Sequence, residues 1–472
     1  MVKSYFNFAQ KTKNCDNNYT LYNSRTGCLS LLDEHHYRLY YDYPEKEISD
    51  VEFLNQLLSC GYIVQSHDEE YDRIRFQMYQ AKFSNSILSL VIAPTMNCNF
   101  ACTYCYEKNQ LHNCLMSEKI QDGIISYIEA YSGLIRKLKI EWYGGEPLLA
   151  TEVIKRMNER IQFICTSNNI QCVEQMITNG YLLDRDHIEF LNTNKIHRIQ
   201  VTLDGVASTH DTRRMHKSGK GTYHEIMENL KLCKLYYHGQ VDLRINVDKN
   251  NITEVDKLVE KLKNEGLYDF VNLYLGRVID TNETSCNSNC MSCQCFAEQN
   301  VNFVAKNNRL RQYLQTSYPQ PIGNSCAADY NFSLVIAPDG DLYKCHMEIG
   351  QQEHCVGNIL ELDNIDISKL KKTIMWDPTQ DEICGSCKYL PVCMGGCAKG
   401  RTETTRDCNY RKYIMDQYLS DISYIETTQG KEEKDEEIIS VFEAVLAVCH
   451  CLSAVYGGRS DGRLNAAEAD VS

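Results

Sequence analysis

From about residue 85 to residue 280, short apolar strand-like segments alternate with amphipathic helix-like segments, and this alternation constrains the fold more than any other feature. The strand-like segments are ILSLVIAP, KLKIEWYGG, VEQMITNG, HRIQVTLDG, VDLRINVD and FVNLYLG. Helical periodicity separates them, as in SEKIQDGIISYIEAY and ITEVDKLVEKLKNEG. Six β/α units in series predict an α/β fold with a parallel sheet and helices outside it, curled into a partial (β/α)6 barrel similar to part of a TIM barrel.

Four short motifs each follow one of these predicted strands. They are CNFACTYC (residues 98–105), YGGEP (143–147), TNG (178–180) and LDG (203–205). In parallel β/α folds, ligands bind at the C-terminal ends of the strands. We therefore expect all four motifs to face one common mouth.

The 24 cysteines among 472 residues indicate metal chemistry. Disulfides suit short secreted chains, whereas this chain is long and its first residues show no signal-peptide pattern. In a reducing cytosol such a count favours iron–sulfur clusters or zinc. Four cysteines stand singly on apolar faces and suit ordinary buried thiols: Cys60, Cys165, Cys172 and Cys233.

Charge and hydropathy exclude two classes of partner. The formal net charge of −14 opposes binding to a nucleic-acid backbone. No run of eighteen apolar residues is present, so we expect no membrane span and a cytoplasmic location.

The loop Cys98-x3-Cys102-x2-Cys105, with Tyr104 just before its last cysteine, brings three thiolates together. An electron-transfer cluster normally has four protein thiolates, so three would leave one iron open. This pattern resembles the radical S-adenosylmethionine (SAM) enzymes. The resemblance implies that the amino and carboxylate groups of SAM bind the open iron of a 4Fe-4S cluster. It also implies that a 5′-deoxyadenosyl radical formed from SAM abstracts a hydrogen atom from the substrate.

The other strand-end motifs extend this resemblance to SAM binding. Gly144 and Gly145 allow the backbone to approach a ligand closely, and Glu146 would accept hydrogen bonds from the SAM ammonium group. Asn179 and Asp204 lie where relatives contact SAM or substrate, although each also suits a helix cap or a turn. The predicted SAM-binding residues are Tyr104, Gly144, Gly145, Glu146, Asn179 and Asp204.

Seven C-terminal cysteines resemble the SPASM extension of radical SAM enzymes, which carries two auxiliary 4Fe-4S clusters. The resemblance implies Cys326, Cys345 and Cys397 as ligands of the first auxiliary cluster. It implies Cys384, Cys387, Cys393 and Cys408 as ligands of the second, giving three clusters in all. A zinc ribbon would account for Cys384, Cys387, Cys393 and Cys397 alone and would leave the other three cysteines unexplained.

The first auxiliary cluster lacks one ligand in this pattern. Relatives that mature sulfatases take that ligand from a cysteine six residues before the first of the seven, where this chain has Gln320. Either the segment CNSNCMSCQC supplies it, or the iron is open to a substrate thiolate, an arrangement that suits thioether formation. The cysteines of that segment are Cys286, Cys290, Cys293 and Cys295, with Cys295 as the candidate ligand. His346 replaces the catalytic Asp that sulfatase maturases carry directly after the second cysteine, which argues against that activity.

The chain divides into five predicted parts. They are a winged-helix-like module (1–84), the radical SAM partial barrel (85–280), a bridging segment (281–325), an iron–sulfur SPASM domain (326–428) and a charged tail (429–472). The order of a hairpin followed by helices in residues 16–66 resembles modules that bind the leader of a precursor peptide, by strand addition near residues 28–31. A scaffold cap on the barrel is the alternative. The tail is either a docking helix or a fused peptide.

The predicted function is a radical SAM enzyme that joins a cysteine sulfur to a carbon in a ribosomally made precursor peptide. Carbon–carbon crosslinking, epimerisation and sulfatase maturation remain alternatives within the class. A tRNA-modifying radical SAM enzyme is opposed by the net charge, and an iron–sulfur electron carrier would need a fourth thiolate at the Cys98 loop. The implied partners are a precursor peptide with its leader and an electron donor such as ferredoxin or flavodoxin.

Overall fold

The computed structural model describes residues 1–12, 18–279, 289–307, 319–401 and 408–420. The chain forms two compact units. The first comprises residues 1–72, 311–321 and 415–472, and the second comprises residues 73–310 and 322–414. Cys286 and the predicted tail at 429–472 lie outside the described residues. The division into five parts remains a prediction.

A nine-stranded sheet forms the centre of the second unit, with the strand order β11-β10-β9-β8-β7-β6-β12-β13-β14. Its parallel part consists of β6 (Ile87–Ile92), β7 (Lys137–Trp142), β8 (Gln171–Ile177), β9 (Arg198–Thr202), β10 (Gln240–Val247) and β11 (Val271–Arg277). All six predicted strands are confirmed, and each pairs in parallel with the next along the chain. Closure into a partial barrel remains a prediction.

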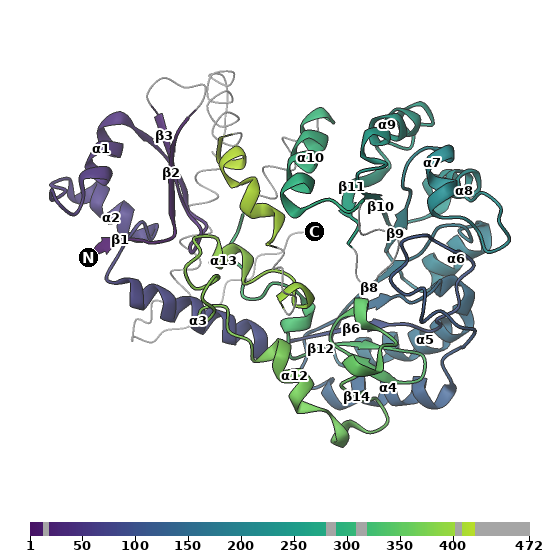
Figure 1. Cartoon of the computed structure of the whole chain (residues 1–472). Helices are drawn as coiled ribbons and strands as arrows, with labels where there is room; N and C mark the ends of the chain where they lie inside the picture. Colours follow the sequence, from purple (N-terminus) through teal and green to yellow (C-terminus); the bar gives the residue numbers. More distant parts are fainter. Residues whose placement is uncertain (13–17, 280–288, 308–318, 402–407, 421–472) are drawn as a thin grey trace. The chain divides into compact units, whose positions relative to one another are not determined.

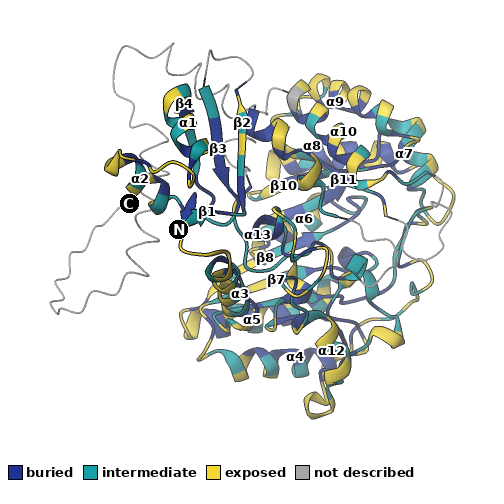
Figure 2. Cartoon of the chain, turned by 60° about the vertical axis from the view of Figure 1, so that its left-hand side comes forward, coloured by how far each residue is buried: buried dark blue, intermediate teal, exposed yellow. Residues whose placement is uncertain are grey.

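Helices connect these strands, as the β/α pattern requires (Figure 1). The predicted helices are confirmed as α4 (Glu118–Tyr131), α5 (Thr151–Ser167), α6 (Arg185–Thr193), α8 (Tyr223–Tyr236) and α9 (Val255–Asn264). A further short helix, α7 (Ala207–Arg213), follows the LDG motif. Figure 2 shows yellow, exposed residues on the outer turns of α9, whose apolar side chains are buried.

Buried and half-buried side chains alternate along β6, which lies between β7 and β12 in the sheet. Leu88, Leu90 and Ile92 are fully buried, whereas the residues between them are only half-buried. Successive side chains of a strand point to opposite faces of its sheet, so one face of β6 packs into the core. Helix α4 packs with its apolar side inward, and Ser117 caps it by accepting a hydrogen bond from Ile120 N.

The C-terminal part of the second unit adds three strands to the sheet. Strand β12 (Ser333–Ile336) pairs in parallel with β6, and β13 (Asp341–Tyr343) and β14 (Gly357–Asn358) continue in antiparallel order. Ala93 and Met96, just after β6, share one buried cluster with Val335, Tyr343 and Ile349. This packing brings the root of the Cys98 loop close to the segment that carries Cys345. In its described residues the second unit also contains α10 (Cys293–Lys306), α12 (Ile367–Ile374) and α13 (Leu390–Cys393).

The first unit contains a three-stranded antiparallel sheet in the order β2-β3-β4. Its elements are β1 (Val2–Lys3), β2 (Asn7–Lys11), β3 (Asn18–Asn23), β4 (Leu29–Asp33), α1 (Glu34–Asp42), α2 (Val51–Ser59) and β5 (Ile63–Val64). Helix α3 (His67–Phe83) starts in this unit and ends in the second. The predicted hairpin and the two short helices after it are confirmed, whereas the winged-helix assignment remains a prediction. Within the described ranges, no helix is both long and apolar enough to cross a membrane.

Candidate functional site: the Cys98 loop and its cavity

The Cys98 loop follows β6 and is held by backbone hydrogen bonds to the last residue of α7 and to the segment after it. Ala101 N donates to Met215 O at 2.9 Å, and Thr103 N donates to Arg213 O at 2.9 Å. Within the loop, Cys105 N donates to Cys102 O at 3.4 Å, which closes a turn. The three cysteines are therefore presented by a loop that neighbouring backbone fixes on one side.

Burial dominates the electrostatics of these three thiols. It raises the pKa of Cys98 and of Cys105 to about 12, and it raises the pKa of Cys102 as well. The negative charge of Cys102 raises the other two pKa values further, which means that the thiols lie near one another. Arg214 opposes this by favouring the thiolate of Cys98 and of Cys102. Without a metal the thiols hold their protons, and metal binding has to displace these protons.

Gly144 and Gly145 bring the loop after β7 directly against the Cys98 loop. A Cβ atom at Gly144 would lie 2.4 Å from Thr95 O, and one at Gly145 would lie 2.3 Å from Asn97 O. Gly144 also has a φ of +102°, which side-chain-bearing residues rarely adopt. The two glycines line the cavity, and they are also required for close contact between the two loops.

Glu146 is fully buried and accepts hydrogen bonds from the protein. Its Oε1 accepts from Leu148 N at 3.1 Å and from Thr178 Oγ1 at 2.8 Å, and its Oε2 accepts from Asn179 N at 2.7 Å. Burial raises the pKa of Glu146. Asn179 in turn donates from Nδ2 to Asn99 Oδ1 at 2.7 Å, so these residues join the ends of β7 and β8 to the Cys98 loop. Oε2 keeps capacity for a further donor.

Asp204 and Tyr104 belong to a buried polar network beside the loop. Asp204 is fully buried and accepts from Arg213 Nε at 3.0 Å, which places its carboxylate outside the cavity wall. The Tyr104 hydroxyl accepts from Arg214 Nη1 at 3.0 Å and from Asn246 Nδ2 at 3.1 Å. Both residues were predicted to bind SAM, but only Tyr104 is among the described residues that line the cavity.

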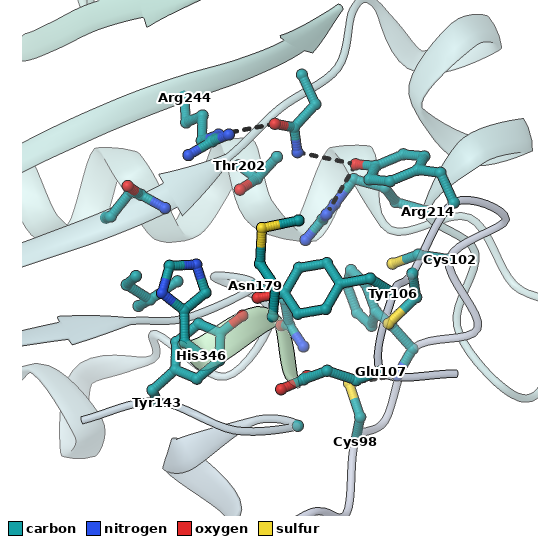
Figure 3. A pocket seen from close by; sticks show the side chains of 18 of the residues that line it. Cys98, Cys102, Tyr106, Glu107, Tyr143, Asn179, Thr202, Arg214, Arg244 and His346 are labelled. Atoms are coloured by element: carbon teal, nitrogen blue, oxygen red, sulfur yellow. Dashed lines mark hydrogen bonds between the residues drawn. The ribbon is translucent and has the colours of Figure 1, made fainter. Parts of the chain in front are cut away.

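A cavity of about 250 Å³ lies at this end of the sheet (Figure 3). All three loop cysteines line it, together with Tyr104, Gly144, Gly145 and Asn179. The fit to a three-thiolate cluster with a small ligand is good on two counts. The donor set is soft sulfur, as iron–sulfur clusters require, and backbone without side chains borders the space beside it.

Several residues of the cavity wall are absent from the sequence-based prediction. They are Tyr106, Glu107, Tyr143, Arg214, Arg244 and His346. Burial raises the pKa of Glu107 to about 8, and its Oε1 has no hydrogen-bond partner in the described part of the chain. Burial lowers the pKa of His346 to about 4, helped by the charge of Arg244. Tyr106 and His346 each stand directly after a motif cysteine in the sequence, and Glu107 follows Tyr106. Tyr143 begins the YGGEP motif. Arg214 and Arg244 have no such marker, because they come from separate elements that meet only in the fold.

The cysteines assigned to the first auxiliary cluster lie near one another. Burial raises the pKa of Cys345 to about 12, and the negative charges of Cys397 and Cys326 raise it further. Lys344, next to Cys345, donates from Nζ to Tyr330 O at 2.6 Å and to Ser333 O at 2.5 Å. This buried lysine fixes the Cys345 segment to the chain that follows Cys326.

Three of the four cysteines assigned to the second auxiliary cluster lie near one another, and one of them lines a second cavity. Burial raises the pKa of Cys393, and the charges of Cys387 and Cys408 raise it further. The second cavity has a volume of about 220 Å³ and is lined by Cys293, Cys397 and Cys408. Cys295, the candidate fourth ligand of the first auxiliary cluster, is not among its described lining residues. Among residues that the structure describes, no three His, Cys, Asp or Glu side chains converge tightly enough for a single metal ion.

Comparison with known proteins agrees with this site. Residues 92–262 match the radical SAM superfamily. The cysteine-type anaerobic sulfatase-maturating enzyme of Clostridium novyi (strain NT) is 25% identical over 375 residues, covering 72% of this chain and 98% of the relative. The serine-type anaerobic sulfatase-maturating enzyme of Bacteroides thetaiotaomicron (strain VPI-5482) is 23% identical over 367 residues, covering 69% of this chain and 86% of the relative.

Solved structures show the same fold. Native anSMEcpe with bound AdoMet and Cp18Cys peptide has a TM-score of 0.56 and 20% identity, covering 72% of this chain and 99% of that one. Streptococcus suis SuiB bound to S-adenosylmethionine has a TM-score of 0.51 and 16% identity, covering 87% of this chain and 98% of that one. Residues 92–262 therefore match the radical SAM superfamily, and the resemblance of the chain to the radical SAM/SPASM peptide maturases, inferred from its cysteine motifs, is confirmed.

Proposed function

We propose that this chain is a radical SAM enzyme that modifies a ribosomally made precursor peptide and forms a thioether from a cysteine sulfur to a carbon. The observation that carries the proposal is the relation between the two cavities. Arg277, Ile279 and Met347 line both, so the cavity of the Cys98 loop adjoins the one lined by Cys397. A substrate bound there would lie between the two sets of cysteines.

The roles of the residues follow from their positions. Cys98, Cys102 and Cys105 would hold the radical SAM cluster, and Gly144, Gly145, Asn179 and Tyr104 would border SAM. Glu146 and Asp204 would act from behind this wall by fixing its loops. When bound, the cluster and SAM together supply a carbon radical that abstracts a substrate hydrogen. The protein's part is to exclude water and to hold one C–H bond in reach.

Two features support a thioether as the product. His346 lines the cavity at the position where sulfatase maturases carry a catalytic Asp, so the carboxylate of that position is replaced by an imidazole. The first auxiliary set has three cysteines, and its fourth position would be filled either by the segment 286–295 or by the substrate thiolate. Cys293 lies on the cavity wall with Cys397, and Cys295 is the other candidate.

The first unit would bind the leader of the precursor peptide. Strand β4 pairs with β3 along one edge, and no strand of the described residues pairs with its other edge. An unpaired edge accepts an added strand through backbone hydrogen bonds, which is how extended peptides bind to sheets. Reduction would come from a ferredoxin or a flavodoxin, and the many free thiols suit a reducing cytoplasm.

Reductive SAM cleavage tests the central claim. The full chain is reconstituted anaerobically with iron and sulfide, supplied with SAM and dithionite, and assayed for 5′-deoxyadenosine. Replacing Cys98, Cys102 and Cys105 together with Ala should abolish the product while the auxiliary iron remains bound. Cys233→Ala removes a buried thiol of α8 outside every motif and serves as the control. Equal cleavage by the triple variant and the wild type would refute the proposal.

Peptide mass spectrometry tests the product. Candidate cysteine-containing precursor peptides are incubated with the reconstituted enzyme, and each thioether should remove two hydrogens and block alkylation of one cysteine. Cys397→Ala should retain some SAM cleavage and lose this product. An unchanged peptide mass together with 5′-deoxyadenosine formation would refute the thioether and indicate epimerisation instead.

Anaerobic sulfatase maturation is the second candidate, because the two relatives described above carry that activity in their names. His346 and Gln320, at positions where the motif of those enzymes has Asp and Cys, oppose it. The same mass measurement separates the two, since conversion of a cysteine to formylglycine removes its sulfur whereas a thioether retains it.

A further inference from the structure

Arg244 is a cation of the cavity wall whose hydrogen-bond partners are neutral. It lies in β10, and its Nε donates to Asn246 Oδ1 at 2.7 Å, as the dashed line in Figure 3 shows. It also interacts with the hydroxyl of Tyr274. Across the ranges that the structure covers, no carboxylate lies within ion-pair distance of Arg244. A half-buried guanidinium usually has an anionic partner, because removing it from water is costly.

The neighbouring strand makes room for this guanidinium. Asn246 of β10 pairs with Gly276 of β11, and a Cβ atom at Gly276 would lie 2.4 Å from Arg244 Nε and 2.7 Å from its Cζ. A glycine inside a strand weakens that strand, and close approach of another group is a common reason for it. Gly276 thus leaves the space that the Arg244 side chain occupies beside the cavity.

The charges of Arg244 and Arg214 act on different groups of the cavity wall. The charge of Arg214 acts on Cys98 and Cys102. The charge of Arg244 instead acts on Tyr143 and His346, and it adds to burial in lowering the pKa of His346. Hydrogen bonds through Asn246 and Tyr104 join Arg244 to Arg214, as the dashed lines in Figure 3 show.

We propose that Arg244 binds a carboxylate of the peptide substrate and so selects a substrate that carries an acidic group near the residue being modified. This inference rests on the proposed function. SAM would border the Cys98 loop, and the dependence of SAM affinity on Arg244 distinguishes the carboxylate of SAM from a carboxylate of the substrate. A planar guanidinium with both Nη groups directed to a carboxylate gives a strong and directional contact.

Local charge has to supply this contact, because the whole chain repels acidic ligands. The formal net charge is −14, yet the cavity wall carries Arg214, Arg244 and Arg277 against one carboxyl group, Glu107. Close charge pairs in a partly buried site act strongly, whereas distant surface charges are screened by salt. Carboxylate binding at Arg244 should therefore persist at physiological ionic strength.

Small carboxylate probes test the proposal on the reconstituted, SAM-loaded full chain. The probes are N-acetyl-aspartate N-methylamide, its asparagine counterpart and N-acetylalanine, and ligand-detected NMR measures the dissociation constants. The aspartate probe should bind the wild type at least about tenfold more tightly than Arg244→Gln, which corresponds to one charge-assisted contact. The asparagine probe should not distinguish the two proteins. Preferential binding of N-acetylalanine instead would identify a C-terminal carboxylate as the source.

Two variants and one further measurement make the result decisive. Arg136→Gln removes an exposed arginine before β7, outside the cavity wall, and should bind the aspartate probe as the wild type does. Arg244→Lys keeps the charge and should recover part of the affinity. SAM affinity should be unchanged in Arg244→Gln. Equal binding of the aspartate probe by the wild type and Arg244→Gln, or a parallel loss of SAM affinity, would overturn the proposal.

The same samples separate this inference from the proposed function. A wild type that binds and cleaves SAM but whose affinity for the aspartate probe does not depend on Arg244 would refute the carboxylate site alone. A wild type that fails to cleave SAM would refute the radical SAM function, whatever the probes do.

Discussion

Arg401 and Asp329 form a buried, two-pronged ion pair. Arg401 Nη1 donates to Asp329 Oδ1 at 2.7 Å, and its Nη2 donates to Oδ2 at 2.6 Å. The two side chains are 4% and 1% exposed. Asp329 closely follows Cys326 and Arg401 closely follows Cys397 in the sequence, so the pair joins two segments that carry cysteines of the same predicted cluster.

Breaking this pair should destabilise the protein strongly. Arg401→Met leaves the Asp329 carboxylate buried without its charged partner, which costs about 3–5 kcal/mol in the free energy of unfolding. Anaerobic denaturant titration of the metal-free chain measures it. Lys306→Met is the control, because Lys306 and Asp256 pair at 2.8 Å with side chains that are 63% and 60% exposed. That change should cost less than about 1 kcal/mol, and similar losses in both variants would contradict the expectation.

The glycines behind the Cys98 loop give a second prediction. Gly145→Ala places a Cβ atom against Asn97 O, so the loop has to move, at a cost of about 1–3 kcal/mol in stability. The reconstituted variant should also lose the iron bound by the Cys98 loop. Gly133→Ala is a matched control, since a Cβ atom there would meet no atom within 4 Å. Iron content and unfolding midpoints are measured for both variants. Retention of full iron by Gly145→Ala would refute the prediction.

The fourth ligand of the first auxiliary cluster gives a third prediction. Cys293 shares a cavity wall with Cys397, so Cys293→Ser should reduce the iron bound after reconstitution and alter the electron paramagnetic resonance spectrum of the reduced protein. Cys295→Ser should leave both unchanged, because Cys295 is not in the described wall of that cavity. Full iron in both variants would mean that the position is open, as a substrate thiolate would require.

His210 gives a prediction about pH. It is fully buried, accepts from Asp204 N at 3.2 Å through Nδ1 and contacts Thr222 Oγ1 at 3.1 Å through Nε2. Burial lowers its pKa from 6.5 to about 3. The unfolded chain therefore takes up a proton that the native state refuses, so the contribution of His210 to stability is full above pH 6.5 and declines as the pH falls below it.

Denaturant unfolding of the metal-free chain at pH 7 and pH 5.5 tests this sign. His210 should account for a loss of about 1 kcal/mol between the two values. His210→Asn keeps an acceptor for Asp204 N and should remove that part of the pH dependence. His238→Asn changes an exposed histidine and serves as the matched control. An identical pH dependence in His210→Asn and the wild type would exclude a buried neutral His210.

The parallel part of the sheet could be predicted because its signals are local. Each strand of β6–β11 is a short apolar run, and each connecting helix has its own apolar stripe, so neighbouring residues contain the information. The pairing of β12 with β6 could not be predicted in this way. Ser333–Ile336 is a four-residue strand, and its partner lies far away in the sequence. Only packing of Val335 and Tyr343 with Ala93 and Met96 selects that edge of the sheet.

The same distinction holds in the site. The spacing of Cys98, Cys102 and Cys105 within one loop predicted by itself that these cysteines would line one cavity, because a short loop leaves them little freedom to separate. Arg244 and His346, which come from separate strands and loops, became cavity residues only when the sheet assembled. Cysteine spacing is a local property of the chain. Whether a buried charge such as Arg244 has a carboxylate beside it depends on every element packed around it, and the tertiary structure alone decides that.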